Sequence, residues 1–348
     1  MLLPSAGSVG RVGESDRTAQ LARLCELVTE SYVFPEVAGQ VVAVLRGQAD
    51  RGRYDGLDDD EAFAAAVTED LQSVNGDRHL RLRYRAQPLA EGEQPFDLDR
   101  YRADAELHAH GFTRVERLPG NVGLCENRGL FAAAIAGPAA TAALTLLAHT
   151  DALIIDLRRC PGGDPAQIAL ICSYLFDEPT HLNDIYDRTT GQTAQFWTLP
   201  YVPGARFGGS KPVYVLTSGE TFSGAEELAY NLQTRDRATV IGERSRGGAH
   251  PCNWHRVAAH LQATVPYGRS VNPVTGTNWE GTGVQPDIAV PADQALDRAY
   301  RLALEHVLTL GEADLRRAVA AEARDALAAL PAVPGPDVST PTPAGTRP

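Results

Sequence analysis

Apolar side chains in the first part of the chain recur at intervals of three and four residues, the period of an amphipathic helix. This pattern predicts two helices within residues 17–49, separated at Pro35. A third predicted helix begins near Asp58 and Glu61, which form a capping-box pattern ahead of further apolar positions at helical spacing. Residues 17–76 are therefore predicted to form a helical subdomain.

After Gly76 the pattern changes to alternation between apolar residues and arginine, from Leu80 to Tyr84, which predicts a strand with one wet face. From Asn121 onward, strand-like and helical patterns alternate along the chain. The predicted strands are 121–125, 152–157, 212–216 and 238–241, and the predicted helices include 138–149 and 225–232. Such alternation is typical of an α/β layered domain, which we place at residues 121–310.

The remaining segments complete the predicted organisation. A flexible N-terminus is expected at 1–16, a connecting strand and loop region at 77–120, a C-terminal helix at 311–330 and a proline-rich disordered tail at 331–348. The 18 uncharged residues from 131 to 148 are long enough to suggest a membrane span. That interpretation is rejected because the stretch is rich in alanine and interrupted by Gly137-Pro138.

Composition narrows the possible functions. The 348 residues are 43% hydrophobic and 22% charged, as in ordinary folded proteins, and the net charge is −12. This charge makes nucleic acid and anionic membranes poor candidate partners. The five cysteines are odd in number and widely spaced, and no signal-peptide pattern opens the sequence, so we expect reduced thiols and a cytoplasmic location. No nucleotide-binding glycine motif is found.

Two segments offer candidate chemistry. Ser223 stands where a buried-type strand turns into a helix, so it is either an N-cap or a nucleophile whose developing charge the helix end would favour. Gly162 and Gly163 follow another strand. A glycine pair allows backbone N–H groups to approach a reacting carbonyl, as an oxyanion hole requires, although it is also common in ordinary turns.

Three motifs in order resemble the tail-specific (C-terminal processing) serine peptidase family over about residues 121–300. They are Asp156-Leu157-Arg158 with Gly162-Gly163, Thr221-Phe222-Ser223-Gly224-Ala225-Glu226, and Asn278-Trp279-Glu280-Gly281-Thr282-Gly283-Val284 with Pro286-Asp287-Ile288. The resemblance implies a crotonase/ClpP-like spiral of ββα units with an N-terminal helical subdomain. It also implies a peptide or protein substrate, an acyl-enzyme intermediate, and no cofactor or metal.

A single lysine, Lys211, separates two branches of that family. In the Ser-Lys branch a Gly-Lys-Gly element follows the serine, but the corresponding segment here, 242–248, contains arginine instead. Lys211 precedes the strand that leads to Ser223, and five strand residues span about 17 Å, so it is expected to lie too far away to act as base. Arginine stays protonated and cannot replace it.

The similarity therefore points to the tricorn-type branch, which uses serine, histidine and glutamate. His79 lies in a segment, Asp77-Arg78-His79-Leu80, that resembles the family's Asp-x-His-Leu element, and it is assigned as the general base. Glu280 matches the glutamate that supports the triad. The oxyanion would be bound by the N–H of Gly224 together with that of Gly162 or Gly163.

Arg78 departs from the pattern, since some tricorn-type relatives have serine beside the histidine. It is either an exposed arginine without a role or a ligand for a substrate carboxylate. Residues 85–119 are too few for an inserted PDZ domain, so the chain also resembles the modules of interphotoreceptor retinoid-binding protein. We expect pocket walls from 85–119 and 180–209, where the sequence looks irregular.

Two other functions stay open at this point. One is a non-catalytic carrier of an apolar, retinoid-like ligand, and the other is an acyl-transfer or cyclising enzyme that uses the same serine. A zinc site is not favoured, because the three histidines that recur at every fifth position lack a Cys-x-x-Cys pair or a helical pattern. These histidines are His250, His255 and His260. The oligomeric state is not predicted.

Overall fold

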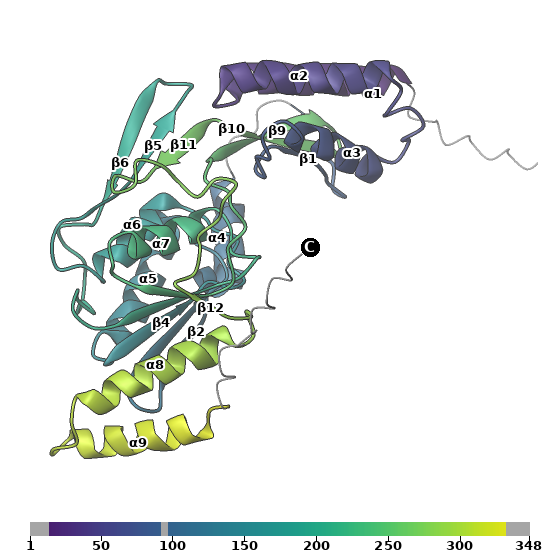
Figure 1. Ribbon diagram of the computed structural model, residues 1–348. Helices are drawn as coiled ribbons and strands as arrows, with labels where there is room; N and C mark the ends of the chain where they lie inside the picture. Colours follow the sequence, from purple (N-terminus) through teal and green to yellow (C-terminus); the bar gives the residue numbers. More distant parts are fainter. Residues whose placement is uncertain (1–13, 92–96, 332–348) are drawn as a thin grey trace, which may run out of the picture.

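The computed structural model describes residues 14–91 and 97–331 (Figure 1). Residues 1–13 of the predicted N-terminus and 332–348 of the predicted tail lie outside the described residues. Helix α1 (Glu14–Ser31) and helix α2 (Pro35–Asp50) are found where the sequence predicts them. Pro35 is the first residue of α2, a position where its missing N–H group has no helical acceptor to lose.

Helix α3 (Asp60–Gln72) is also present, but the prediction of its N-cap was wrong by one residue. The Asp59 side chain accepts hydrogen bonds from the backbone N–H groups of Glu61 and Ala62. Asp58 instead offers its carbonyl oxygen to the guanidinium of Arg17, at 3.1 Å. Aspartate is a favoured N-cap residue, so a run of aspartates leaves the exact cap position open.

The helical unit packs on a small antiparallel sheet whose strands come from distant parts of the sequence. Strand β1 (Arg81–Tyr84) pairs with β10 (Leu261–Pro266), and β10 pairs with β9 (Cys252–Ala258). Arg81 lies opposite Thr264 in this register. The helices and strands share one apolar core, which includes Leu24, Val41, Phe63, Leu82 and Ala263. The domain boundaries given above stay a prediction.

The centre of the molecule is a six-stranded sheet. Its order is β12 (Ile288–Ala289), β8 (Thr239–Gly242), β7 (Val213–Thr217), β4 (Ala152–Asp156), β3 (Val122–Asn127) and β2 (Phe112–Leu118). All neighbouring strands are parallel except β2, which is antiparallel to β3 at one edge. The predicted α/β class is confirmed, whereas the finer description as a ββα spiral stays a prediction.

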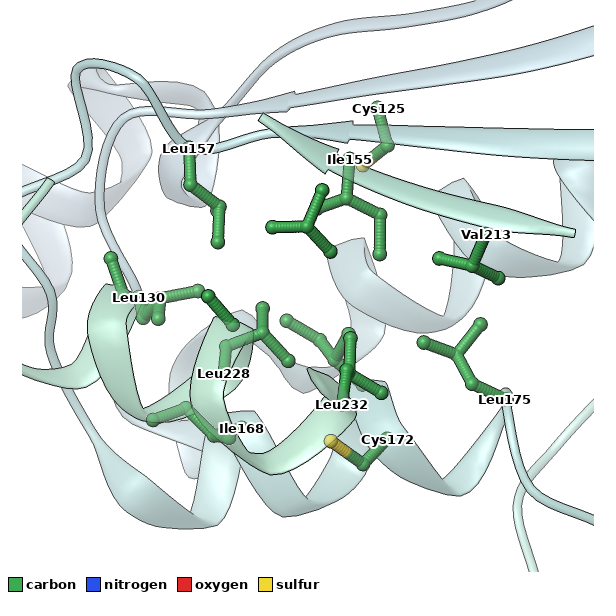
Figure 2. Close-up of a cluster of buried hydrophobic side chains, with 14 of the residues drawn as sticks. Cys125, Leu130, Ile155, Leu157, Ile168, Cys172, Leu175, Val213, Leu228 and Leu232 are labelled. Atoms are coloured by element: carbon green, nitrogen blue, oxygen red, sulfur yellow. The ribbon is translucent and has the colours of Figure 1, made fainter. Parts of the chain in front are cut away.

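Helices cover both faces of this sheet, as Figure 1 shows. They are α5 (Ala133–Leu147), α6 (Pro165–Ser173) and α7 (Gly224–Gln233) on one face, and α8 (Ala295–Thr309) and α9 (Arg316–Ala329) on the other. Ile155 packs toward α5–α7 (Figure 2), while its neighbour Ile154 packs toward α8 and α9. Alternate residues of a strand point to opposite faces, so a sheet covered on both sides requires continuous apolar strands.

The uncharged stretch 131–148 behaves differently from the prediction. Gly137-Pro138 does not interrupt it, because α5 continues through Pro138. Pro138 lies inside α5, where it removes one backbone hydrogen bond and crowds the preceding turn, but packing against α6 and the sheet holds the helix together. No helix within the described residues is both long and apolar enough to cross a membrane.

The two segments that look irregular in sequence contain regular elements. The first holds α4 (Leu98–Leu107), a short 3₁₀ turn (Ala109–Gly111) and the whole of β2. The second holds the hairpin β5 (His181–Asp187) and β6 (Gln192–Trp197), which is completed by β11 (Gly268–Val271). Both segments contribute to the walls of the main cavity, as expected.

Candidate active site

Two neighbouring parallel strands bring the candidate nucleophile and the glycine pair together. Strands β4 and β7 are adjacent, so their carboxyl ends meet at the same edge of the sheet. The loop after β4 carries Gly162 and Gly163, and the turn after β7 carries Ser223. Hydrogen bonds tie the two loops together: the Thr221 hydroxyl donates to the Leu157 carbonyl at 2.9 Å, and the Phe222 N–H donates to the Cys160 carbonyl at 3.1 Å.

Ser223 has an unusual backbone conformation at the start of α7. Its φ is 54° and its ψ is −124°, whereas an ordinary N-cap residue is extended with negative φ. A non-glycine residue at positive φ is strained, and such strain is concentrated at functional sites. The Ser223 N–H donates to a carboxylate oxygen of Glu226 at 2.8 Å, which helps to hold the residue in this conformation.

The glycine pair packs directly against the serine turn. A Cβ atom added to Gly162 would lie 2.5 Å from the Gly224 nitrogen and 2.9 Å from the Ser223 Cβ. One added to Gly163 would lie 1.9 Å from the carbonyl oxygen of Leu130. Side chains cannot occupy these positions, so the close approach of the two loops requires glycine.

The backbone N–H groups at this contact differ in their partners. Gly163 forms a bridge with Leu130, but the bonds of this bridge use the Gly162 carbonyl and the Asp164 N–H, at 2.9 and 2.7 Å. The Gly162 N–H contacts the Cys160 thiol. The Gly224 N–H belongs to the first residue of α7, where no intrahelical acceptor exists. A Cβ on Gly224 would lie only 2.8 Å from the Gly163 nitrogen, so these two amides are neighbours.

His79 reaches this edge from the helical unit, between α3 and β1. Its ring stacks on Phe222 with centroids 4.4 Å apart, and a Cβ added to Gly248 would lie 2.7 Å from its Cε1. The Nδ1 atom has no hydrogen-bond partner among the described residues. Burial lowers the pKa of His79 to about 4, against the opposing influence of Asp77, so the imidazole is neutral near pH 7.

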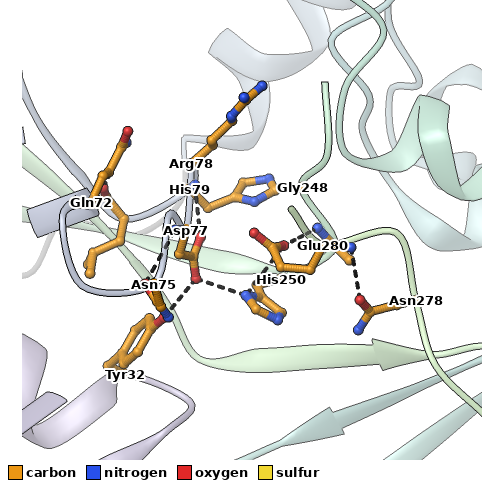
Figure 3. Close-up of polar contacts among 12 residues, drawn as sticks. Tyr32, Gln72, Asn75, Asp77, Arg78, His79, Gly248, His250, Asn278 and Glu280 are labelled. Carbon is orange, nitrogen blue, oxygen red and sulfur yellow. Dashed lines mark hydrogen bonds and ion pairs between the residues drawn. The ribbon is translucent and has the colours of Figure 1, made fainter. Parts of the chain in front are cut away.

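Asp77 is fully buried and anchors a polar cluster beside His79 (Figure 3). One carboxylate oxygen accepts from the His79 N–H at 3.0 Å. The other accepts from the Tyr32 hydroxyl at 2.9 Å and from His250 Nδ1 at 2.8 Å. Burial alone would raise the pKa of Asp77, but the hydrogen bond and the charge of His250 hold it below the usual range. Asp77 in turn raises the pKa of His250.

Glu280 completes the cluster from the loop after β11. Its Oε2 accepts from the Ala249 N–H at 2.5 Å and lies 3.4 Å from His250 Nδ1, while its Oε1 has no hydrogen-bond partner among the described residues. Burial raises the pKa of Glu280, and the nearby charge of Asp77 raises it further.

One donor atom each of Asp77, His79 and Glu280 lies within 4.8 Å of the other two. These residue types bind metal ions, but the Asp77 oxygens already accept three protein hydrogen bonds. The arrangement fits an acid–base cluster in which a proton on His79 would be stabilised by a carboxylate.

Glu226 connects the serine turn with the loop beside His79. Its buried carboxylate accepts four hydrogen bonds, from Ser223 N–H at 2.8 Å, Ser245 hydroxyl at 2.6 Å, Gly247 N–H at 2.6 Å and Gly248 N–H at 2.9 Å. Burial nevertheless raises its pKa. The carboxylate therefore sets the relative positions of the nucleophile and of Gly248, which contacts the His79 ring.

Five of the six predicted site residues line one cavity of about 1000 Å³. They are Ser223, His79, Gly162, Gly163 and Gly224, and the sixth, Glu280, contributes its carboxylate next to His79. Lys211 lies elsewhere: its Nζ donates to the carbonyls of Ala148 and Thr150, at 2.6 and 2.9 Å, near the start of β7. His260 bonds to the Arg85 carbonyl and His250 to Asp77, so the three evenly spaced histidines do not converge.

Two sequence models of known protein families match the chain. The sequence model of peptidase family S41 matches residues 133–290. A second model, the N-terminal domain of these peptidases in eukaryotic IRBP, matches residues 14–107. The chain belongs to peptidase family S41. A carboxy-terminal-processing protease from Bartonella bacilliformis is 30% identical over 175 residues, which are 47% of this chain and 35% of that protein. The chain thus spans about a third of the length of this relative.

Solved structures show the same fold at low sequence identity. A lipoprotein from Streptococcus agalactiae has a TM-score of 0.55 at 15% identity and covers 88% of this chain and 98% of its own. A putative peptidase from Parabacteroides merdae also has a TM-score of 0.55, at 16% identity, with 87% and 100% covered. The tricorn protease has a TM-score of 0.52 at 12% identity and covers 90% of this chain but 37% of its own.

Several residues of this S41 site received no role in the prediction from sequence. Asp77 was part of the recognised segment but received no role, and His250 was considered only as a metal ligand. Glu226, three residues after Ser223, carried a usable signal, because serine followed by glutamate at this spacing is a capping-box pattern. Nothing in the sequence indicated that Asp77 and His250, 173 positions apart, would be in contact.

Proposed function

We propose that this S41 chain is a serine peptidase that cleaves peptide bonds through an acyl-enzyme formed on Ser223. The observation that carries the proposal is the juxtaposition in one cavity of a strained serine at a helix start and a neutral, buried histidine brought from the other unit. A serine that only capped a helix would need neither the positive φ nor the neighbouring imidazole. The likeness to a carboxy-terminal-processing protease supports the same class of reaction.

In the proposed mechanism His79 accepts the Ser223 hydroxyl proton as the serine attacks the peptide carbonyl. Its low pKa keeps it unprotonated at neutral pH, so a ring nitrogen is available to take that proton. Glu280, which has a carboxylate oxygen within 4.8 Å of a ring nitrogen of His79, stabilises the resulting imidazolium. His79 then returns the proton to the leaving amine, and water hydrolyses the acyl-enzyme.

The oxyanion is assigned to the N–H groups of Gly163 and Gly224. These amides are neighbours, and the Gly162 N–H is directed to the Cys160 thiol instead. The N-terminus of α7 adds the positive end of a helix dipole at the same place. Asp77 and His250 hold the His79 segment through the backbone and are positioning residues.

The substrate is proposed to be a peptide or protein, and the site of action the cytoplasm. All five cysteines are unpaired, which supports a reducing compartment.

Covalent labelling with a fluorophosphonate probe tests the nucleophile directly. We expect the intact protein to gain one probe mass at Ser223, and the Ser223→Ala and His79→Ala variants to gain none. Ser73→Ala, at the exposed end of α3, is the matched control and should label like the wild type.

A folded protein that is not labelled would contradict the triad and favour the carrier of an apolar ligand. If labelling succeeds, product analysis with and without an added amine separates hydrolysis from acyl transfer or cyclisation. Amide products in preference to free acids would assign the transferase function.

A further inference from the structure

The cavity has a strongly basic wall although the protein carries a net charge of −12. Four arginines line it: Arg78, Arg81, Arg83 and Arg246, which we call the arginine wall. Within residues 14–91 and 97–331, none of the four forms an ion pair with a carboxylate. Arg128, which also lines the cavity, differs in that it pairs with Glu126. The arginine wall therefore gives this side of the cavity an excess of positive charge.

The acidic residues of the cavity do not cancel this charge. Asp187 lines the cavity from the β5–β6 hairpin, where one of its oxygens accepts hydrogen bonds from Thr189 and Thr190, and it supplies one negative charge against the four arginines. Glu227 is only 4% exposed, and burial raises its pKa to about 8, so it is mostly protonated at pH 7. The cavity therefore stays positive near neutral pH.

Contacts within the arginine wall fix its position without neutralising it. Arg81 Nε donates to the Arg78 carbonyl at 2.8 Å, and Arg78 donates to the Arg246 carbonyl. The guanidinium of Arg246 lies 4.9 Å from the centre of the Phe222 ring. Burial and the mutual repulsion of the arginines lower the pKa of Arg81 and Arg83, but both remain protonated. Carbonyl and ring partners leave the full charge available to a ligand.

The sequence of β1 explains why these charges face the cavity. Leu80 and Leu82 belong to the apolar core of the helical unit, so the alternating Arg81 and Arg83 point to the opposite side. Two strand positions are about 7 Å apart, which is also the spacing between alternate side chains of an extended peptide. The wet face of this strand is thus suited to contact two alternate residues of a substrate.

The arginine wall lies on the side of the cavity where the leaving fragment must be. Arg81 follows His79 by two residues, and Gly248, which touches the His79 ring, follows Arg246 by two. In acyl-enzyme formation His79 hands its proton to the leaving amine, so the fragment C-terminal to the cleaved bond lies beside His79. The oxyanion donors are on the other strand loops, after β4 and β7.

We propose that the arginine wall selects peptides with acidic side chains immediately C-terminal to the cleaved bond. Arg81, Arg83 and Arg246 bind those carboxylates, and the bond cleaved is the one already assigned to Ser223 and His79. This inference rests on the proposed peptidase function and names its substrate class.

Internally quenched peptides that differ only after the cleavage site test the proposal. Two carry glutamate or glutamine at alternate positions and end in an amide, and a third is the glutamine peptide with a free C-terminal carboxylate. We expect the wild type to cleave the glutamate peptide with a kcat/KM at least about 10-fold higher than the glutamine peptide, with the ratio falling as salt is raised. A higher kcat/KM only for the peptide with the free C-terminal carboxylate would overturn the proposal.

Substitutions of Arg83 test whether the arginine wall causes the preference for glutamate. Arg83→Gln should bring the glutamate-to-glutamine ratio close to one, and Arg83→Glu should reverse it. Arg256→Gln, on β9 of the same sheet but outside the cavity lining, is the matched control and should keep the wild-type ratio. A preference for glutamate that survives in both Arg83 variants would contradict the assignment.

A binding experiment separates this proposal from the proposed function. Fluorescence anisotropy with the Ser223→Ala protein and the same labelled peptides reports recognition without cleavage. Tighter binding of the glutamate peptide would support the arginine wall even if the wild type hydrolysed nothing and took up no fluorophosphonate. Equal binding of both peptides, with normal labelling of the wild type, would contradict selection by the arginine wall but not the proposed peptidase function.

Discussion

The two sides of the cavity are built on different principles. The nucleophile side is made of backbone: Ser223, Gly162 and Gly163 lie in short loops at the ends of adjacent parallel strands, in contacts too close for any Cβ on the glycines. The base side is made of buried titratable groups, with the neutral imidazole of His79 and the carboxyl of Glu280 brought together from separate segments. The nucleophile side therefore tolerates no added atom, whereas the base side tolerates no loss or displacement of a titratable group.

The largest effect is expected where the two sides are joined, at Glu226. In Glu226→Gln one carboxylate oxygen becomes an NH₂ group that faces backbone N–H donors. Leaving buried donors unsatisfied costs about 1–3 kcal/mol each, so the free energy of unfolding should fall by about that amount or more. The accompanying shift of Ser223 and Gly248 should lower kcat/KM by about 100-fold. Urea unfolding and peptide cleavage measure the two effects.

Glu178→Gln, an exposed glutamate after α6, serves as control and should change neither quantity. Wild-type activity in Glu226→Gln would show that the two sides are positioned independently.

The base side alone is tested by Glu280→Gln, which removes the charge and keeps the shape. We expect kcat to fall by about 100-fold with little change in KM, because the carboxylate acts on the imidazolium formed during the reaction. Since the pKa of Glu280 is raised, wild-type kcat should increase with pH as the carboxyl ionises between acidic and neutral pH. The variant should lack this increase. An unchanged pH profile would remove Glu280 from the mechanism.

Steric tolerance is tested by Gly248→Ala. The new Cβ would lie 2.3 Å from Phe222 Cε2 and 2.7 Å from His79 Cε1, so the stacked rings must move. A displacement of this size should lower kcat by about 10- to 100-fold. Gly219→Ala, in the turn after β7, is the control because nothing lies within 4 Å of its added Cβ. Equal activity of both variants would mean that the His79 ring position is not critical.

The last prediction concerns stability, at Glu227, one residue after Glu226. Its carboxyl has a pKa raised to about 8, so the folded state binds the proton more tightly than the unfolded state. The free energy of unfolding should therefore fall as pH rises from about 4.5 toward 8, by at most about 1.4 kcal/mol for each pH increment of one. Glu227→Gln should be more stable than the wild type at pH 8 and similar at pH 5, in urea unfolding.

Glu30→Gln on the exposed face of α1 is the control and should show no such dependence. A destabilised Glu227→Gln at pH 8 would mean that this carboxylate is ionised and satisfied.

Local features of the sequence predicted individual elements on both sides of the cavity. Pro35 marks the start of α2, and the turn that carries Ser223 is recognisable from a buried strand followed by a helical pattern. The base side depends on contacts between distant segments, such as Asp77 with His250, which periodicity cannot reveal. His79 and Glu280 were found through a family resemblance. Alternation showed that β1 has a wet face but not that it faces the cavity.

The pairing of β1 with β10 also determines when the proposed proteolytic site can form during synthesis. Arg81 pairs with Thr264, so the segment that carries His79 can reach its folded position only after most of the chain has been synthesised. Contacts between residues so far apart in sequence form late, because a long loop must close first. During synthesis the chain thus displays Ser223 without His79, its proposed base. A proteolytic site assembled in this way is inactive while the nascent polypeptide, and its neighbours on the polysome, are still unfolded and vulnerable.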